Sequence, residues 1–284
     1  MTLLEFDNDV LQRDFFERPF TVRHNLVDHP LLKLDRIGEL ADSLDAGQVE
    51  HNMGDVPEVL PDGEAPKLDL PPGEIVRGIE TNGAWIVLKR VETDPEYKQL
   101  LDQTLDEVIP LVADRGGGAT TKQAFIFLSA PNSTTPVHFD PEDNFLLQIR
   151  GPKEMNVAPW PSEELENDEV TRYHGGGHRN IGLKPEGGTA FRMGPGDGVY
   201  VPLHALHWVK TFDEPSISFS ITFNTQHNES LIGTYSLNAR LQKLGLSPKA
   251  PGTRPGSDKA KAAVWNGLRR GKGAVRSLTS RNGS

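Results

Sequence analysis

The sequence predicts a mainly β fold: a double-stranded β-helix of the jelly-roll or cupin kind, with an N-terminal helical elaboration and C-terminal helices. Three observations lead to this prediction. From residue 122 onward, short apolar runs alternate with Gly, Pro and Asp at turn-like intervals. The run over 216–224 alternates apolar and polar residues, as a strand with two unlike faces does. Before residue 122 and after residue 228, apolar residues instead recur at helical spacing.

The first 121 residues are predicted to form helices and loops that pack on the barrel. Helical spacing covers 9–16, 35–44 and 94–112. The last of these starts at Asp94-Pro95, where Asp94 suits the cap and Pro95 the first turn. Residues 54–73, rich in Pro, Gly and acids, predict a surface loop, and 85–88 a short buried strand.

Seven segments of the second half have the composition of strands. Each is short, rich in β-branched, aromatic or aliphatic residues, and bounded by Gly, Pro or Asp. So many strands at turn-marked intervals indicate an all-β sandwich or barrel. The predicted strands cover 124–129, 145–150, 153–158, 189–193, 198–201, 206–210 and 216–224, and helices follow at 229–244 and 259–268.

The chain also divides by charge. Its 284 residues include 40 Asp and Glu against 30 Lys and Arg, a net charge of −10. Residues 247–284 hold nine Lys or Arg and a single Asp, so this tail carries +8 and residues 1–246 carry −18. The predicted organisation is an N-terminal elaboration (1–121), the barrel (122–226), a helical dimerisation segment (227–246) and a basic tail (247–284). Because binding to phosphates needs clustered cations, we expect no nucleic-acid partner except at the tail.

Composition excludes several other classes. The chain has no cysteine, so disulfides, thiolate metal sites and a catalytic cysteine are ruled out. The N-terminus lacks the basic and apolar regions of a signal peptide, and no apolar run approaches the roughly 20 residues of a membrane span. We therefore expect a cytoplasmic protein with no membrane partner.

The sharpest chemical feature is the segment around His138-Phe139-Asp140. Alternate side chains of an extended segment share a face, so His138 and Asp140 point the same way and can chelate one metal ion. A later strand offers His204 and His207 as a third ligand. Two His and one carboxylate with open positions are typical of non-haem Fe(II) oxygenases. A His-x-Asp pair alone also occurs by chance or for structural reasons.

A lysine supports an oxygenase. Lys153 follows Gly151-Pro152 and opens an apolar strand, where its ammonium group can pair with a dicarboxylate co-substrate. On spacing alone a solvated turn lysine fits equally well. The polar face of the strand over 216–224 has the same two interpretations, a cavity lining or a solvated face.

Together these segments resemble a known family. Residues 135–153, TPVHFDPEDNFLLQIRGPK, and 194–208, GPGDGVYVPLHALHW, are similar to the cupin-like branch of the JmjC-type Fe(II)/2-oxoglutarate oxygenases, which contains the asparaginyl hydroxylase of hypoxia-inducible factor. The resemblance is strong over 122–224 and weaker over 15–20. His-x-Asp, the lysine thirteen residues after Asp140 and the GPGD strand occur in the order that the family has.

The resemblance implies the roles of the metal-site residues. It makes His138, Asp140 and His207 the iron ligands and the catalytic centre. His207, rather than His204, stands where the family has its distal histidine, which leaves His204 as a wall or rim residue.

The resemblance also implies a co-substrate site. Lys153 matches the lysine that pairs with the distal carboxylate of 2-oxoglutarate, Thr135 a hydroxyl that hydrogen-bonds this carboxylate, and Asn144 an amide that lines the same pocket. The final strand departs from the family, because the alignment places Thr222 where an asparagine stands in the relative. This shorter group needs a water molecule or a shifted co-substrate.

The implied activity is that of an Fe(II)- and 2-oxoglutarate-dependent dioxygenase that consumes O2. It is a hydroxylase of a protein or peptide side chain, or of a small molecule, and it couples oxidative decarboxylation of 2-oxoglutarate to C–H hydroxylation. Demethylation is chemically possible, but the branch favours hydroxylation. The alternatives are a metal-binding cupin of another class, such as an isomerase or a 2-oxoglutarate-independent dioxygenase, and a non-catalytic binding or regulatory module.

Two further segments carry predictions. Relatives of this type build homodimers from C-terminal helices, which implies a dimer through 229–246 with an apolar contact supplied by Leu231, Tyr235, Leu237, Leu241 and Leu244. The connection 159–188 lacks periodicity and is either a lid facing substrate or a plain insertion. Its His174 and His178 would share a face of a helix and could bind zinc, but the three glycines between them disfavour a helix.

Overall fold

Twelve strands form the core of the described part of the chain. The computed structural model describes residues 2–59 and 66–281, with side chains as far as Arg269. The strands are β1 (Leu4–Glu5), β2 (Phe20–His24), β3 (Val49–Met53), β4 (Ala84–Lys89), β5 (Ala119–Ser129), β6 (Thr134–His138), β7 (Asp143–Arg150), β8 (Lys153–Ala158), β9 (Thr189–Met193), β10 (Asp197–Val201), β11 (Leu206–Thr211) and β12 (Ser216–Thr225).

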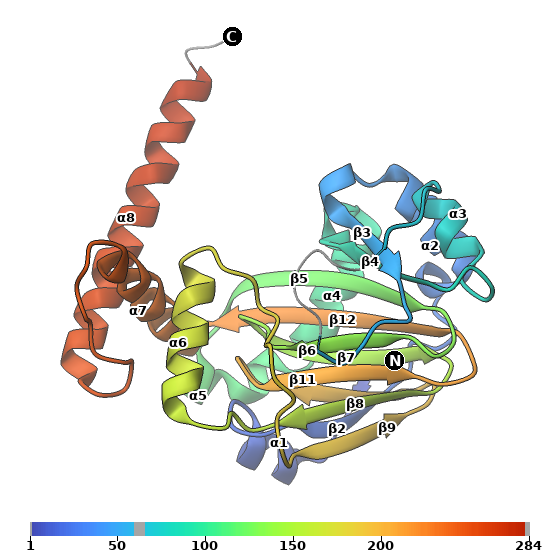
Figure 1. Ribbon diagram of the computed structural model, residues 1–284, viewed down its shortest axis with the longest axis horizontal. Coiled ribbons are helices and arrows are strands. Elements are labelled where there is room, and N and C mark those ends of the chain that lie inside the picture. The colour runs from blue at the N-terminus through green and yellow to red at the C-terminus, as the bar shows by residue number, and fades with distance from the viewer. Residues whose placement is uncertain (1, 60–65, 282–284) are drawn as a thin grey trace.

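These strands pair into two antiparallel sheets that face each other (Figure 1). The large sheet has the order β1-β2-β10-β7-β12-β5-β4-β3, and the small sheet the order β6-β11-β8-β9. Neighbours in both sheets are largely distant in sequence, as expected when a chain winds between two layers. The predicted double-stranded β-helix is therefore confirmed.

Helices lie around the sheets rather than between them. They are α1 (Asn8–Asp14), α2 (Leu34–Ser43), α3 (Pro72–Arg77), α4 (Pro95–Asp106), α5 (Ala113–Gly116), α6 (Glu163–His174), α7 (Gln226–Lys243) and α8 (Pro255–Arg281). Figure 1 shows α2 and α3 at one end of the sheets and α6, α7 and α8 at the other, with α8 projecting from the body. Among the described helices, none is both long and apolar enough to cross a membrane.

Strand β12 lies at the centre of the large sheet between β5 and β7, and all ten of its residues are buried. Its apolar side chains, such as Phe219 and Ile221, belong to the main core. Its alternate hydroxyls face the other way, and Ser218 and Ser220 contact polar side chains of β7 and β8. The solvated-face interpretation of this strand is therefore wrong, because its polar face lines the space between the sheets.

The N-terminal region forms the expected helices but also extends the large sheet. Asp94 caps α4 by accepting hydrogen bonds from the backbone N–H groups of Glu96 and Tyr97. The helix ends at Asp106 instead of 112, because Pro110 follows and the chain continues as a 3-10 turn. Strands β1 to β4 all come from this region, although the sequence predicted only the segment that became β4. These strands are short, so they show little periodicity.

The connection 159–188 contains a helix, α6, that was not predicted. Its first turn is acidic, and the Ser162 hydroxyl at the cap accepts a hydrogen bond of 3.1 Å from the Leu165 N–H. Only Val170 and Thr171 of this helix are buried, so it shows almost no apolar periodicity. Capping and tertiary contact, rather than pattern, account for the helix.

The C-terminal helices form a hairpin. Helix α7 follows β12 directly, and α8 packs against it where Gly233 lies close to Ala262: a Cβ on Gly233 would come within 3.0 Å of the Ala262 Cα. Helix α8 is longer than the predicted 259–268 and continues to Arg281.

Candidate metal centre

Three candidate ligands come together between the two sheets. His138 ends β6, Asp140 follows two residues later, and His207 lies in β11 directly opposite His138 in the antiparallel register. One ligand atom from each residue lies within 4.8 Å of the others, and all three residues are buried. The gap between the His207 Nε2 and the nearer Asp140 oxygen is 3.5 Å. This spacing suits atoms that share one cation.

Hydrogen bonds set the orientation of both imidazoles. The Nδ1 atoms of His138 and His207 lie 2.8 and 2.9 Å from the carbonyl oxygens of Pro136 and Ala205. A carbonyl only accepts, so each Nδ1 carries the hydrogen and each Nε2 keeps a free lone pair for a metal. Burial, together with the neighbouring His207 and Arg179, lowers the pKa of His138 to about 3. His138 is therefore neutral at physiological pH, the form that binds a metal.

Asp140 is held in its ionised form. Burial alone would raise the pKa of its carboxyl, but the Arg179 guanidinium and the two histidines outweigh burial and hold this pKa well below its usual range. Arg179 donates a hydrogen bond of 2.5 Å to Oδ1. Oδ2, on the side of His207, stays available to a cation. Two imidazoles and one carboxylate form a donor set that fits a divalent transition metal such as Fe(II).

Lys153 lies in the same pocket and has no anionic partner. Its side chain is buried, and Nζ donates a hydrogen bond of 2.5 Å to the Ser218 hydroxyl. Among the described residues, no carboxylate oxygen lies within 4.0 Å of this amine. Burial lowers the pKa of Lys153 to about 7. A buried lysine without a counter-ion is costly, so this position favours an anionic ligand. The solvated-turn interpretation of Lys153 is wrong.

Of the three other predicted co-substrate residues, two lie in the pocket and one does not. Thr135 and Asn144 line the pocket with the three ligands and Lys153. The Asn144 amide accepts from Ser220 at 2.8 Å, and its Nδ2 lies 3.5 Å from Asp140 Oδ2. Thr222 stands opposite Asn144 in the register but is not among the residues that line the pocket.

Three buried polar atoms on β12 have no hydrogen-bond partner among the described residues: the Thr222 Oγ1, the Asn224 Oδ1 and the Thr225 Oγ1. An unpaired buried polar group is costly unless a ligand or water satisfies it. Asn224 was not predicted as a site residue. Its signal in the sequence is its position on the polar face, two residues after Thr222.

Sequence reasoning also missed six residues of the pocket wall, three of which lie outside the strands that carry the predicted site residues. Trp85 and Phe127 come from β4 and β5, and Arg179 comes from the connection after α6. Nothing in the local sequence distinguishes these residues, because only the fold brings them to the metal ligands. The free volume between these side chains is small, about 40 Å³.

The remaining histidines do not join the cluster. His204 is buried and packs edge-on against Phe139 and Tyr235, and it is not among the residues that line the pocket. His174 ends α6 and stacks on Tyr235, whereas His178 lies beyond the helix and is exposed. The two therefore do not share a helical face. Within the described residues, the cluster of His138, Asp140 and His207 is the only group of three such ligands.

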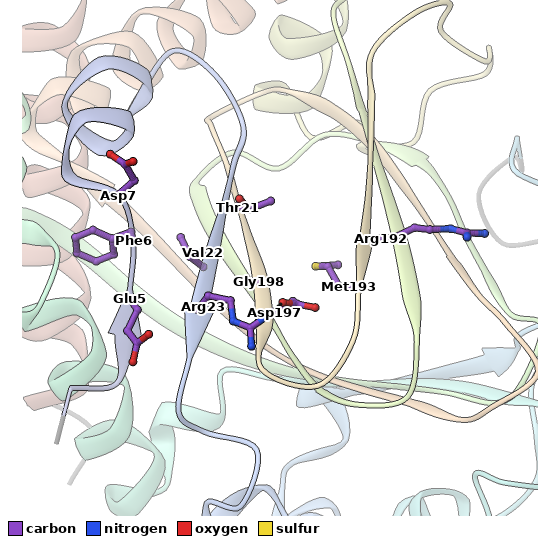
Figure 2. Close-up of a pocket in the computed structure, with 10 residues that line it drawn as sticks. All are labelled: Glu5, Phe6, Asp7, Thr21, Val22, Arg23, Arg192, Met193, Asp197 and Gly198. Carbon is purple, nitrogen blue, oxygen red and sulfur yellow. Dashed lines mark hydrogen bonds and ion pairs between the residues drawn. The ribbon is translucent and has the colours of Figure 1, made fainter.

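A larger cavity, of about 490 Å³, lies away from these ligands (Figure 2). Arg23 pairs there with Asp197, and the Arg192 side chain points away from this pair and contacts Glu154 instead. The charged groups of this cavity thus do not converge on a common point, so the cavity lacks the polar anchors of an active site. The lining residues are Glu5, Phe6, Asp7, Thr21, Val22, Arg23, Arg192, Met193, Asp197 and Gly198.

Comparisons with known proteins agree with this geometry. Residues 100–231 match the model of the JmjC domain, a range that contains the three ligands and Lys153. No curated protein sequence matches the chain. Among solved structures, YcfD of Escherichia coli is similar with a TM-score of 0.53 and 17% identity, over 90% of this chain and 63% of that one. The chain thus spans less than two thirds of the length of this relative.

Two further structures of the same relative carry ligands. YcfD, described as a ribosomal oxygenase, in complex with cobalt and 2-oxoglutarate gives a TM-score of 0.50 at 18% identity, covering 90% of this chain and 62% of that one. Its complex with cobalt and succinic acid gives 0.51 at 17%, covering 93% and 67%. At this identity the structures establish the fold alone, and the matched model covers a little less than half of the chain. Residues 100–231 are therefore similar to a JmjC domain, and they fold as a double-stranded β-helix.

Proposed function

We propose that the protein is an Fe(II)- and 2-oxoglutarate-dependent oxygenase that hydroxylates a C–H bond while 2-oxoglutarate is decarboxylated to succinate. One observation carries the proposal. A His–Asp–His cluster and a buried lysine without a counter-ion line the same pocket, so it offers a cation site and an anion site together. The complexes of the similar YcfD with cobalt and 2-oxoglutarate or succinic acid support it.

Each residue has a defined task in this proposal. His138, Asp140 and His207 hold the iron on one face, which leaves positions for the co-substrate and O2. When bound, the iron supplies the activation of O2. Lys153 binds the distal carboxylate of 2-oxoglutarate, and Thr135 and Asn144 contribute neutral hydrogen bonds to it. The buried walls keep water away from the reacting groups.

Anaerobic titration tests this proposal. Fe(II) is added to the apoprotein, followed by 2-oxoglutarate, and a weak visible charge-transfer band is expected. His138→Ala should abolish the band, whereas His29→Ala, at a histidine distant in sequence from the cluster, should retain it. If the wild-type protein gives no band, or His138→Ala keeps it, the proposal is wrong.

The alternatives make different predictions. A 2-oxoglutarate-independent cupin would bind metal but show no response to 2-oxoglutarate, and Lys153 would have no purpose beside the metal. A non-catalytic module would need neither an intact set of three ligands nor a buried amine. Both features are retained here, which favours the oxygenase.

The prime substrate is proposed only as a class. A protein or peptide side chain is favoured over a small molecule, because the similar YcfD is described as a ribosomal oxygenase. Ribosomal proteins are therefore the first candidates, to be tested by searching for a mass increase of 16 Da after incubation with Fe(II), 2-oxoglutarate and O2. The closer relationship to the hypoxia-inducible-factor branch and the cytoplasmic location stay predictions.

We also propose a homodimer through the C-terminal helices. Tyr235 is buried within its own chain, but Leu244 is 77% and Leu246 56% exposed, and Val264 and Leu268 of α8 are exposed as well. Exposed apolar side chains of this kind favour burial against a second surface. Sedimentation equilibrium of the wild type against Leu244→Glu/Leu246→Glu tests the dimer, which should dissociate in the double variant. The role of the basic tail stays open.

A further inference from the structure

The three proposed ligands are not fixed by the same structure. His138 and His207 face each other in neighbouring strands, so the sheet itself sets their separation. Asp140 lies beyond the end of β6, in the segment that leads to β7. Its backbone carbonyl accepts a hydrogen bond of 3.0 Å from the His204 N–H, in the turn that precedes His207. The position of Asp140 thus depends on contacts between this segment and that turn.

Asp143 makes a second link between the same two segments. It stands three residues after Asp140 and is wholly buried. Its Oδ1 accepts hydrogen bonds from the Tyr200 hydroxyl at 2.6 Å and from the Leu203 N–H at 3.2 Å. Leu203 precedes His204 in one turn. The backbone N–H groups of these two adjacent residues therefore donate to Asp143 and to Asp140, the two ends of the segment.

A third element reaches the same carboxylate. The Asn228 side chain, buried in the first turns of α7, donates a hydrogen bond of 2.5 Å to Asp143 Oδ2. About two turns further along α7, Tyr235 packs against the His204 ring with centroids 5.5 Å apart. His204 has a φ of +63°, a left-handed conformation that a non-glycine residue keeps only when its surroundings hold it. Helix α7 therefore supports the turn at two points.

We propose that Asp143 is a positioning residue that fixes Asp140 relative to His207 by binding the turn 200–203 and α7 to the segment that carries Asp140. This inference rests on the proposed metal centre and goes beyond it, since Asp143 itself does not touch the metal. A buried carboxylate with only a structural role would affect unfolding but not the geometry of a bound metal. Partners of metal ligands that act by orientation typically alter metal affinity by about 10- to 100-fold.

Cobalt(II) binding to the full-length chain separates these two roles. Asp143→Ala removes all three hydrogen bonds, so Co(II) affinity should fall by roughly 10- to 100-fold and the d–d absorption of the bound ion should shift. Asp143→Asn still offers an oxygen to Tyr200 and Leu203, so it should recover most of the affinity and the wild-type spectrum. Each variant is first shown to be folded by circular dichroism.

Two tyrosines provide a matched control. Tyr200→Phe and Tyr97→Phe each remove one buried hydroxyl that donates a hydrogen bond, from Tyr200 to Asp143 and from Tyr97 to the Leu31 carbonyl at 2.5 Å. Both should lower the midpoint of thermal unfolding. Only Tyr200→Phe should weaken Co(II) binding, by several-fold, while Tyr97→Phe stays within about twofold of wild type. This pair decides the question even if Asp143→Ala does not fold.

The possible failures are distinct. If wild-type protein does not bind Co(II), the proposed metal centre fails, and the inference with it. If wild type binds but folded Asp143→Ala and Tyr200→Phe keep its affinity and spectrum, Asp143 is structural only. Failure of Asp143→Asn to rescue would also overturn the positioning role, because charge rather than hydrogen bonding would then be required.

Discussion

The two ends of the proposed pocket differ in how their charges are balanced. At the ligand end, the Asp140 carboxylate already contacts Arg179 and lies beside His207, so it is stabilised before any metal arrives. At the opposite end, Lys153 contacts only the Ser218 hydroxyl, and burial alone accounts for its lowered pKa. The first end is therefore electrostatically balanced in the free protein, whereas the second requires an anion.

The largest expected effect lies at the ligand end. His207→Ala removes one of three protein ligands, so Fe(II) or Co(II) affinity should fall at least about 100-fold, measured by anaerobic titration. His178→Ala should leave affinity unchanged and still bind one metal per chain. Loss of bound metal in His178→Ala would instead support the second metal site considered for His174 and His178.

At the other end, Lys153→Ala should strongly weaken the binding of 2-oxoglutarate and leave metal binding intact. A hydrogen-bonded pair between a buried amine and a carboxylate contributes about 1.5–3 kcal/mol, so its loss should raise the 2-oxoglutarate requirement by roughly 10- to 100-fold. Metal affinity should change by less than about twofold. Equal losses of both affinities would show that the two ends are not separate sites.

The difference between the ends also predicts a pH dependence. Lys153 has a pKa of about 7 in the free protein, and a bound carboxylate stabilises the protonated amine and raises this pKa. Binding of 2-oxoglutarate therefore takes up a proton above pH 7, and its affinity should fall by up to about tenfold per pH unit between 7 and the pKa of the complex. Binding isotherms from pH 6 to 9 measure this effect. Lys153→Arg, which stays charged, should show a flat profile.

His138, Asp140 and Lys153 were predictable from sequence because their signals are local. His138 and Asp140 share a face by the two-residue period of a strand, and Lys153 follows a Gly-Pro turn. The choice of His207 over His204 came from the resemblance, and the structure brings His207 to the other two ligands.

What escaped prediction depends on the tertiary fold. Arg179 reaches Asp140 from a connection 39 residues further along the chain. Trp85 reaches the pocket on β4, one of the strands by which the N-terminal region widens the sheet, and only this pairing brings it there. Helix α6 depends on its Ser162 cap and on two buried residues, so apolar periodicity could not indicate it. Contacts of this kind carry no periodic or motif signal.

The smallest effect concerns stability, and it tests the imbalance at Lys153 without any ligand. Because Lys153 has a lower pKa in the folded protein than in the unfolded chain, its charged form opposes folding; this cost is fully present below pH 7 and disappears as the pH rises toward 10.5. Lys153→Met keeps the length and removes the charge, so the apoprotein should gain about 1–2 kcal/mol in free energy of unfolding at pH 6.

This gain should shrink toward pH 9, in urea denaturation of both proteins. Lys122→Met, at a half-buried lysine that pairs with Asp102 at 3.0 Å, is the control and should give no gain. If Lys153→Met were less stable than wild type at pH 6, Lys153 would stabilise the fold, and its charge would need no anionic ligand. A gain in stability combined with loss of 2-oxoglutarate binding is the result expected of a site that binds an anionic ligand at a cost in stability.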